Sequence, residues 1–99
     1  MIDGIFDPTM ASLEKSISHA TKTQEIISQN IANAQTPGYV AKKFDKVLER
    51  AVERRDSTGV NLEEEMAAMA QNSGRHSAYL KLMSSKLAIL RTVISQGRK

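Results

Sequence analysis

The stretch Asn33-Ala34-Gln35-Thr36-Pro37-Gly38-Tyr39 divides this 99-residue chain into two helical parts. Proline disfavours the helical backbone at the residue before it, so a helix arriving at Asn33 has to end close by. The Pro37-Gly38 pair fits the two central positions of a type II turn, where glycine supplies the positive φ of the second position. We therefore expect a helix over about residues 8–33, followed directly by a tight turn.

The expected first helix carries one narrow apolar stripe. Asp7-Pro8 is typical of an N-cap followed by proline at the first helical position. Apolar or small residues then recur at alternating steps of three and four, with Gln24 filling one gap, which is the spacing of a coiled-coil seam. The stripe consists of Met10, Leu13, Ile17, Ala20, Ile27 and Ile31. Most other positions are polar, so only this stripe favours burial.

A longer seam runs through the end of the chain, where the steps of four and three continue without a break. Asn61 is a good N-cap, and Glu63–Glu65 place acid where the helix dipole favours it, with Glu64 at the capping-box position. A helix of about 35 residues would be about 50 Å long. Gly74 lies inside it, and either a close helix contact or a local hinge would explain that glycine. The seam consists of Leu62, Met66, Met69, Ser73, His76, Leu80, Met83, Leu87, Leu90 and Ile94.

The segment between these two helices is short and amphipathic. Its apolar residues are spaced as on one side of a short helix, although the sequence leaves a strand-like arm or a loop open. Ser57-Thr58-Gly59 predicts a turn at its end. The apolar residues are Phe44, Val47, Leu48, Ala51 and Val52.

These elements predict an all-α fold, in which two long terminal helices pack as an antiparallel coiled-coil hairpin. The expected parts are an N-terminal helix in 1–36, a turn and short variable middle in 37–60, and a C-terminal coiled-coil helix in 61–99. Ordering the backbone costs about 1–2 kcal/mol of conformational entropy per residue. Two apolar stripes that face each other leave most of the surface of each helix exposed to solvent. We therefore expect the helices to complete their burial against other chains.

The composition argues against an enzyme or a cofactor protein. The chain has no Cys, which excludes disulfides and thiolate metal sites, and its two histidines, His19 and His76, have no metal-binding spacing. No apolar run approaches the roughly 20 residues that span a bilayer. The N-terminus also lacks the basic start and apolar stretch of a cleavable signal. We expect no catalytic residue, no metal, no cofactor and no membrane insertion.

The charge pattern supports a second hypothesis from another class. Residues 71–99 contain six bases and no acid, whereas residues 61–70 contain three acids and no base. A one-signed helix is also found in a small basic helical-hairpin regulator that binds acidic partners or nucleic acid. The bases are widely spread, however, and Tyr79 is the only aromatic residue among them, so no stacking platform is formed. Salt separates the two hypotheses, since phosphate binding weakens steeply with ionic strength.

The run from Ser28 to Tyr39 resembles the N-terminal signature of the bacterial flagellar axial proteins, which form rod, hook and hook-associated structures. Val60–Ala67 and Leu87–Ile94 resemble the proximal rod members of that family. Its members usually have a middle segment longer by some tens of residues than the one in this chain. The residues that carry the signature are Asn30, Ile31, Ala32, Asn33, Thr36, Pro37, Gly38 and Tyr39.

The resemblance implies a structural subunit of the flagellar basal-body proximal rod, part of the axial drive shaft between the MS ring and export gate and the distal rod. It implies that the terminal helices assemble through the two seams, and that Tyr39 packs beside a neighbouring subunit. We expect Ile2, Ile5 and Phe6 to anchor the N-terminus in a neighbour, because exposed apolar residues need a burial site.

The implied partners are other copies of the chain, the other rod proteins, the adapter between rod and MS ring, the MS-ring protein and the export-gate proteins. Nucleic acid is not among them. The implied location is the periplasmic rod, reached through the flagellar type III export system without a cleaved signal.

Overall fold

A computed structural model describes residues 8–54 and 59–97 of the chain. The expected N-cap Asp7, the expected anchors Ile2, Ile5 and Phe6, and most of the turn expected at 57–59 lie outside these residues. The elements follow in the order α1 (Pro8–Ala32), β1 (Lys42–Asp45), β2 (Arg50–Glu53) and α2 (Leu62–Gly97).

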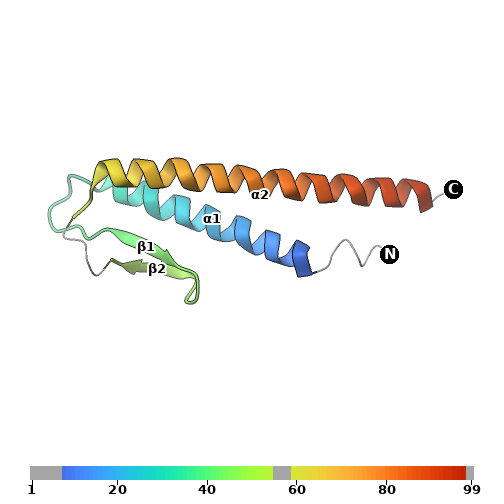
Figure 1. The fold of residues 1–99 in the computed structure, drawn as a ribbon. Coiled ribbons are helices and arrows are strands. Elements are labelled where there is room, and N and C mark those ends of the chain that lie inside the picture. Colours follow the sequence, from blue (N-terminus) through green and yellow to red (C-terminus); the bar gives the residue numbers. More distant parts are fainter. Residues whose placement is uncertain (1–7, 55–58, 98–99) are drawn as a thin grey trace.

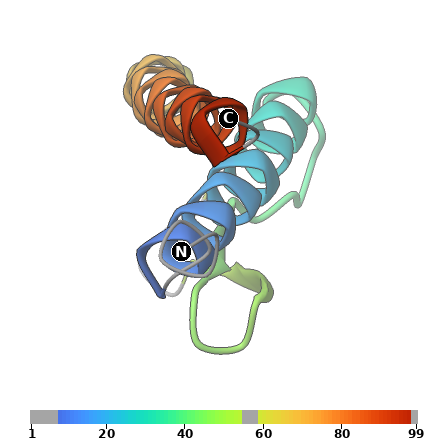
Figure 2. The same cartoon turned by 90° about the vertical axis from the view of Figure 1, so that its right-hand side faces the viewer.

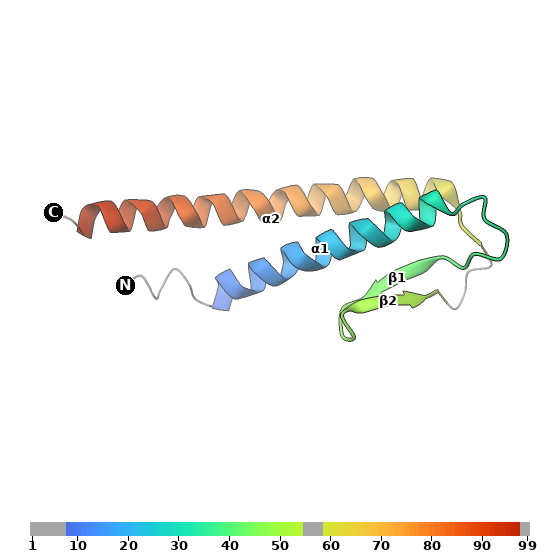
Figure 3. The ribbon, with the colours of Figure 1, turned by 180° about the vertical axis from the view of Figure 1, so that it is seen from behind.

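The two helices form an antiparallel hairpin, as expected. In Figure 1, α1 and α2 lie along each other, and the start of α1 lies towards the same end as the finish of α2. The view along the helices shows that they cross at an angle rather than running parallel (Figure 2). Figure 3 shows α2 continuing well past the start of α1, so that among the described residues no helix lies beside its last turns.

Both expected helix boundaries have the predicted local chemistry. Pro8 is the first residue of α1. At the start of α2, the Asn61 Oδ1 accepts a hydrogen bond from the Glu64 N–H at 3.2 Å, so Asn61 is the N-cap. Gly74 causes no break, because α2 is continuous from residue 62 to 97. A Cβ at Gly74 would meet nothing within 4 Å, so no close helix contact inside the described chain requires this glycine.

The short helical stretch predicted for the middle segment is wrong. Residues 42–45 and 50–53 form a two-stranded antiparallel hairpin, in which Lys42 faces Glu53 and Asp45 faces Arg50. The spacing of Phe44, Val47 and Leu48 fits a helix, but a left-handed backbone at Glu49, with φ 54°, reverses the chain instead. This hairpin packs on α1 rather than continuing the helical pattern.

The molecule is elongated and buries little of itself. Its extents are 65 × 23 × 15 Å and its radius of gyration is 18.2 Å, compared with about 13 Å for a compact domain of this length. The buried apolar residues, all from α1 and the segment after it, are Met10, Leu13, Ala20, Ile26, Ile27 and Ala41. Three buried polar residues, Asn30, Glu65 and Asn72, complete the interior of the described chain.

Candidate functional site

The side chain of Asn30 joins three segments at the end of the helical hairpin where α1 ends and α2 begins. It is completely buried. Its Nδ2 donates to the Lys42 carbonyl at 2.8 Å and to the Glu65 Oε2 at 3.0 Å. Its Oδ1 accepts from the Lys42 N–H at 3.0 Å and from the Tyr39 hydroxyl at 3.2 Å. One carboxamide therefore holds α1, β1 and α2 together with all its donors and acceptors in use.

Glu65 is the second member of this buried network. It is only 1% exposed, which for a carboxylate demands a close partner. The Arg54 Nη1 forms an ion pair with Glu65 Oε1, while the Asn30 Nδ2 bonds its other oxygen. The Arg54 N–H also donates to the carbonyl of buried Ala41 at 2.9 Å. The end of β2 is thus tied both to α2 and to the start of β1.

The predicted type II turn is confirmed. The Tyr39 N–H donates to the Thr36 carbonyl at 3.2 Å, and Gly38 has a φ of 78°. The Thr36 hydroxyl donates to the Asn33 Oδ1 at 3.1 Å, while the Asn33 Nδ2 donates back to the Gln29 carbonyl at 2.9 Å. Asn33 therefore satisfies a carbonyl at the end of α1 and holds the turn at the same time.

The remaining signature residues have different places. Pro37 and Ala32 are exposed, and Ile31 is half-buried. Tyr39, which the resemblance places beside a neighbouring subunit, is half-buried and bonds within its own chain. Its ring also lies 5.9 Å from the Lys42 Nζ, close enough for a cation–π contact.

The seam residues of α1 mostly face the interior of the hairpin. Met10, Leu13 and Ile27 are buried, and Ile17 is half-buried. Ile26, outside the predicted seam, is also buried, because the β hairpin covers a second side of α1.

The seam residues of α2 divide into two groups. Met69, Met83 and Leu90 are half-buried. The other five apolar members are 37–58% exposed: Leu62, Met66, Leu80, Leu87 and Ile94. We name these five residues the outer seam.

The contact with α1 uses polar residues of α2, namely His76 of the predicted seam and Asn72 of a neighbouring line. The Asn72 Nδ2 donates to the Ala20 carbonyl at 2.8 Å and to the Gln24 Oε1 at 2.9 Å. His76 Nε2 lies 3.2 Å from the Thr21 hydroxyl. Sequence reasoning missed Asn72 because a search for apolar positions passes over an amide. The signal was a heptad line one residue away, which runs through Glu65, Asn72 and Tyr79.

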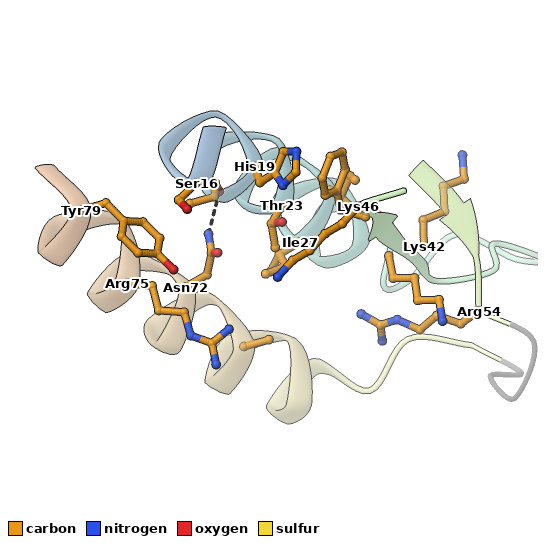
Figure 4. Close-up of a pocket in the computed structure, with 15 residues that line it drawn as sticks. Ser16, His19, Thr23, Ile27, Lys42, Lys46, Arg54, Asn72, Arg75 and Tyr79 are labelled. Carbon is orange, nitrogen blue, oxygen red and sulfur yellow. Dashed lines mark hydrogen bonds between the residues drawn. The ribbon is translucent and has the colours of Figure 1, made fainter. Parts of the chain in front are cut away.

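A groove of about 300 Å³ opens between α1, the β hairpin and α2. Figure 4 draws its lining residues. Ser16 and His19 lie on α1, Arg75 and Tyr79 lie on α2, and Lys42 and Arg54 lie at the start and the end of the β hairpin. Ile26, Ile27, Phe44 and Ala68 supply its apolar walls. Its charged lining residues are Lys42, Lys43, Lys46, Arg54 and Arg75, and no carboxylate lines it. We name this feature the basic groove.

The tip of the β hairpin is held by side-chain contacts at both ends of its loop. The Asp45 Oδ1 accepts from the Val47 N–H at 2.9 Å and from the Leu48 N–H at 3.0 Å. The Leu48 hydrogen bond, followed by that of Val47, holds the pKa of Asp45 below its ordinary value. This Asx turn leaves Val47 91% exposed and Leu48 53% exposed at the tip.

The other end of the loop rests on α1. Glu49 Oε1 lies 3.4 Å from the His19 Nε2 and 3.7 Å from the Lys15 Nζ. The hydrogen bond from His19, supported by the charge of Lys15, lowers the pKa of Glu49. The His19 ring packs on Phe44 with centroids 5.1 Å apart.

Two kinds of site were searched for in the described residues. No group of three or more His, Asp or Glu side chains there could hold a metal ion. None of the helices there has the length and apolar character needed to cross a membrane.

Comparison with known proteins gives two matches. The family model described as flagella basal body rod protein matches residues 18–39, which contain the whole signature and the end of α1. The flagellar basal body rod protein FlgB of Bacillus subtilis (strain 168) is 27% identical, and the match covers 95% of this chain and 98% of that protein. The alignment is 127 residues long, so the relative has residues that this 99-residue chain lacks. The chain is therefore similar to the flagellar basal body rod proteins over residues 18–39, and to FlgB of Bacillus subtilis over most of its length.

Proposed function

We propose that this chain is a structural subunit of the proximal part of the flagellar rod, and that the outer seam of α2 is a surface through which it assembles. Similarity to the rod proteins supports the structural role. The use of the outer seam is tested by substitutions on α2.

The observation that carries this proposal is the surplus of exposed surface. The chain exposes 7254 Å², whereas a compact monomer of 10.9 kDa exposes about 5,600 Å². The difference is about 1,700 Å², and a stable protein interface covers about 800 Å² on each partner. The surplus therefore equals about two such contacts, which is what a subunit with a neighbour on each side needs.

The outer seam has the chemistry expected of one of these contacts. Its five members are large apolar side chains that recur along the whole of α2, from Leu62 to Ile94. A line of exposed apolar residues on one helix is a common site of helix–helix association. The buried bonds of Asn30 and Glu65 hold α2 at a fixed angle to α1, so the seam is presented by a pre-organised hairpin.

The rod position suggests specific partners and a route to the site. We propose contacts with other copies, other rod subunits, the adapter between rod and MS ring, the MS-ring protein and the export gate. We further propose passage through the flagellar type III export system into the periplasmic part of the basal body. The small apolar interior supports export, because a chain with little buried surface is easily kept unfolded. The role in this proposal is mechanical, and no catalysis is included.

The regulator hypothesis is not supported by the comparisons, which match a structural family. Arg75, Lys81 and Arg91 are exposed on α2, and of these three bases only Arg75 lines the basic groove.

The proposal is tested by charging the outer seam. Leu80→Glu with Leu87→Glu places two carboxylates on it, and we expect loss of rods and of swimming when this variant replaces the rod subunit of a flagellated bacterium. The matched control is Ala78→Glu with Ser85→Glu, which adds the same charges at the same spacing on exposed positions of α2. We expect the control to build rods. Equal assembly by both variants, with equal helix content by circular dichroism, would exclude the outer seam as an assembly surface.

A further inference from the structure

The basic groove is a second surface, and the outer seam does not use it. It lies on the side of α2 that carries Ala68, Arg75 and Tyr79. The line through Ala68 and Arg75 continues at seven-residue steps to Leu82 and Ile89, each 56% exposed. The α2 wall of the groove therefore extends as an exposed apolar strip beyond Tyr79.

The chemistry of the groove specifies an occupant that is both acidic and apolar. Five cationic side chains line it, and of these only Arg54 forms an ion pair with a carboxylate of the described residues, that of Glu65. Between these cations lie the side chains of Ile26, Ile27 and Phe44. Grooves that combine like charge with apolar walls favour a segment of opposite charge that carries apolar anchors.

We propose that residues 1–7 of a neighbouring copy occupy the basic groove. This segment reads Met1-Ile2-Asp3-Gly4-Ile5-Phe6-Asp7, with two acids, three large apolar residues after the Met, and no basic side chain. It therefore matches the groove in charge and in apolar character. The inference rests on the proposed function, because a rod subunit always has neighbours that can supply such a segment.

Reach favours a neighbouring copy over the same chain. Asp7 is directly bonded to Pro8, and Ser16, the groove residue nearest in sequence, lies eight residues further along α1, or about 12 Å. Within one chain, the peptide bond to Pro8 keeps Asp7 about eight helical residues from Ser16, so both acids cannot reach the groove lining together. A segment from a second copy can place both acids and all its apolar residues against the lining, which uses the full charge complementarity.

Binding is tested first with a synthetic peptide of residues 1–7, labelled with fluorescein, whose anisotropy is measured as the full-length chain is added. Lys43→Glu with Lys46→Glu reverses two charges of the groove, and we expect peptide affinity to fall by about tenfold or more. The matched control Lys81→Glu with Arg91→Glu makes the same change in net charge at exposed positions outside the groove lining. We expect it to stay within about twofold of the unaltered chain.

The apolar part of the match is tested with a second peptide. Replacing Ile5 and Phe6 by serine keeps both acids, and we expect this peptide to lose binding. Equal binding of both peptides, equal weakening by both charge variants, or no binding at all would each overturn the proposal, because simple charge attraction or no groove occupancy would then explain the data.

Disulfide cross-linking tests whether the segment comes from a neighbouring copy or from the same chain. The natural chain has no Cys, so only the introduced cysteines can react. We expect an Ile5→Cys chain to cross-link to a Thr23→Cys chain, since Thr23 lines the groove, but not to a Ser28→Cys chain, since Ser28 lies on the opposite side of the helix pair. A concentration-independent link within one chain carrying Ile5→Cys and Thr23→Cys would overturn the assignment to a neighbour. Rod formation by the unaltered chain is scored separately, so failure of the rod role and failure of the groove are told apart.

Discussion

The side chain of Asn30 connects several elements of the fold at one buried point. Its carboxamide makes four hydrogen bonds, which reach β1, the turn and α2. Sequence reasoning could identify it as part of a signature, but not as a buried junction, because its partners Lys42 and Glu65 lie in segments whose relative position only the fold determines.

Replacement of Asn30 by alanine leaves the Glu65 carboxylate and the Lys42 peptide groups buried with fewer partners. We expect Asn30→Ala to lower the free energy of unfolding by about 2–3 kcal/mol, because unsatisfied buried polar groups are costly. Urea unfolding followed by circular dichroism measures this. Gln35→Ala, an exposed position in the same signature, is the control and should change stability little. A loss as small as that of the control would contradict the role of Asn30.

The turn requires glycine at position 38 because of the positive φ there, and not because a side chain would lack room. A Cβ there would meet nothing within 4 Å, but the φ of 78° is unfavourable for most side chains. We expect Gly38→Val to destabilise the turn by about 1–2 kcal/mol and to impair rod assembly, whereas Gly38→Asn, which tolerates this conformation, should retain both. Rods counted by electron microscopy and the melting temperature together provide the test. Normal rods with Gly38→Val would refute the importance of the turn.

At the scale of elements, local signals predict the helices well and the β hairpin badly. The start of α1 at Pro8, the N-cap Asn61 and the turn at Pro37-Gly38 depend on neighbouring residues, so they can be found in a sequence. The β hairpin depends on Asn30 binding both peptide groups of Lys42, which is a contact between distant segments. The apolar residues at 44, 47 and 48 fit either structure, and tertiary contact decides between them.

The face that α2 turns towards α1 is a second feature that the sequence pattern does not predict. The sequence predicts one long seam, apolar except at Ser73 and His76, but the fold turns part of it outward and buries Glu65 and Asn72. A hydrophobic pattern cannot reveal this choice, because the line through Glu65, Asn72 and Tyr79 lies only one residue from the seam positions Met66, Ser73 and Leu80.

The β-hairpin tip provides a pH prediction. Folding lowers the pKa of Asp45, so its contribution is present above the ordinary carboxyl pKa and is lost as pH falls through the lower, folded value. We expect the tip to loosen at pH below about 4, seen as faster hydrogen exchange of the Val47 and Leu48 amides relative to residues of α1. Asp45→Asn keeps an acceptor that does not titrate, and its tip should show no such transition. A transition of equal size in that variant would assign it to another group.

At the scale of the whole molecule, exposed surface links folding to assembly. Six apolar and three polar residues form the buried interior of the described chain, and the last turns of α2 extend beyond α1. A chain with so little interior gains stability from anything that binds only its folded form, by an amount that rises with the concentration of that partner.

We therefore expect the purified chain alone to melt at low temperature with a weak transition, and to gain helix and stability when other proximal rod proteins are added. At a partner concentration about 100 times the dissociation constant, the gain should be about 2.7 kcal/mol. Circular dichroism melts combined with sedimentation measure both the structure and the complex. The outer-seam variant Leu80→Glu with Leu87→Glu should show no gain, whereas Ala78→Glu with Ser85→Glu should match the unaltered chain. A stable, cooperatively melting monomer that is indifferent to partners would mean that the helical hairpin is complete by itself, and would break the link between exposed surface and assembly.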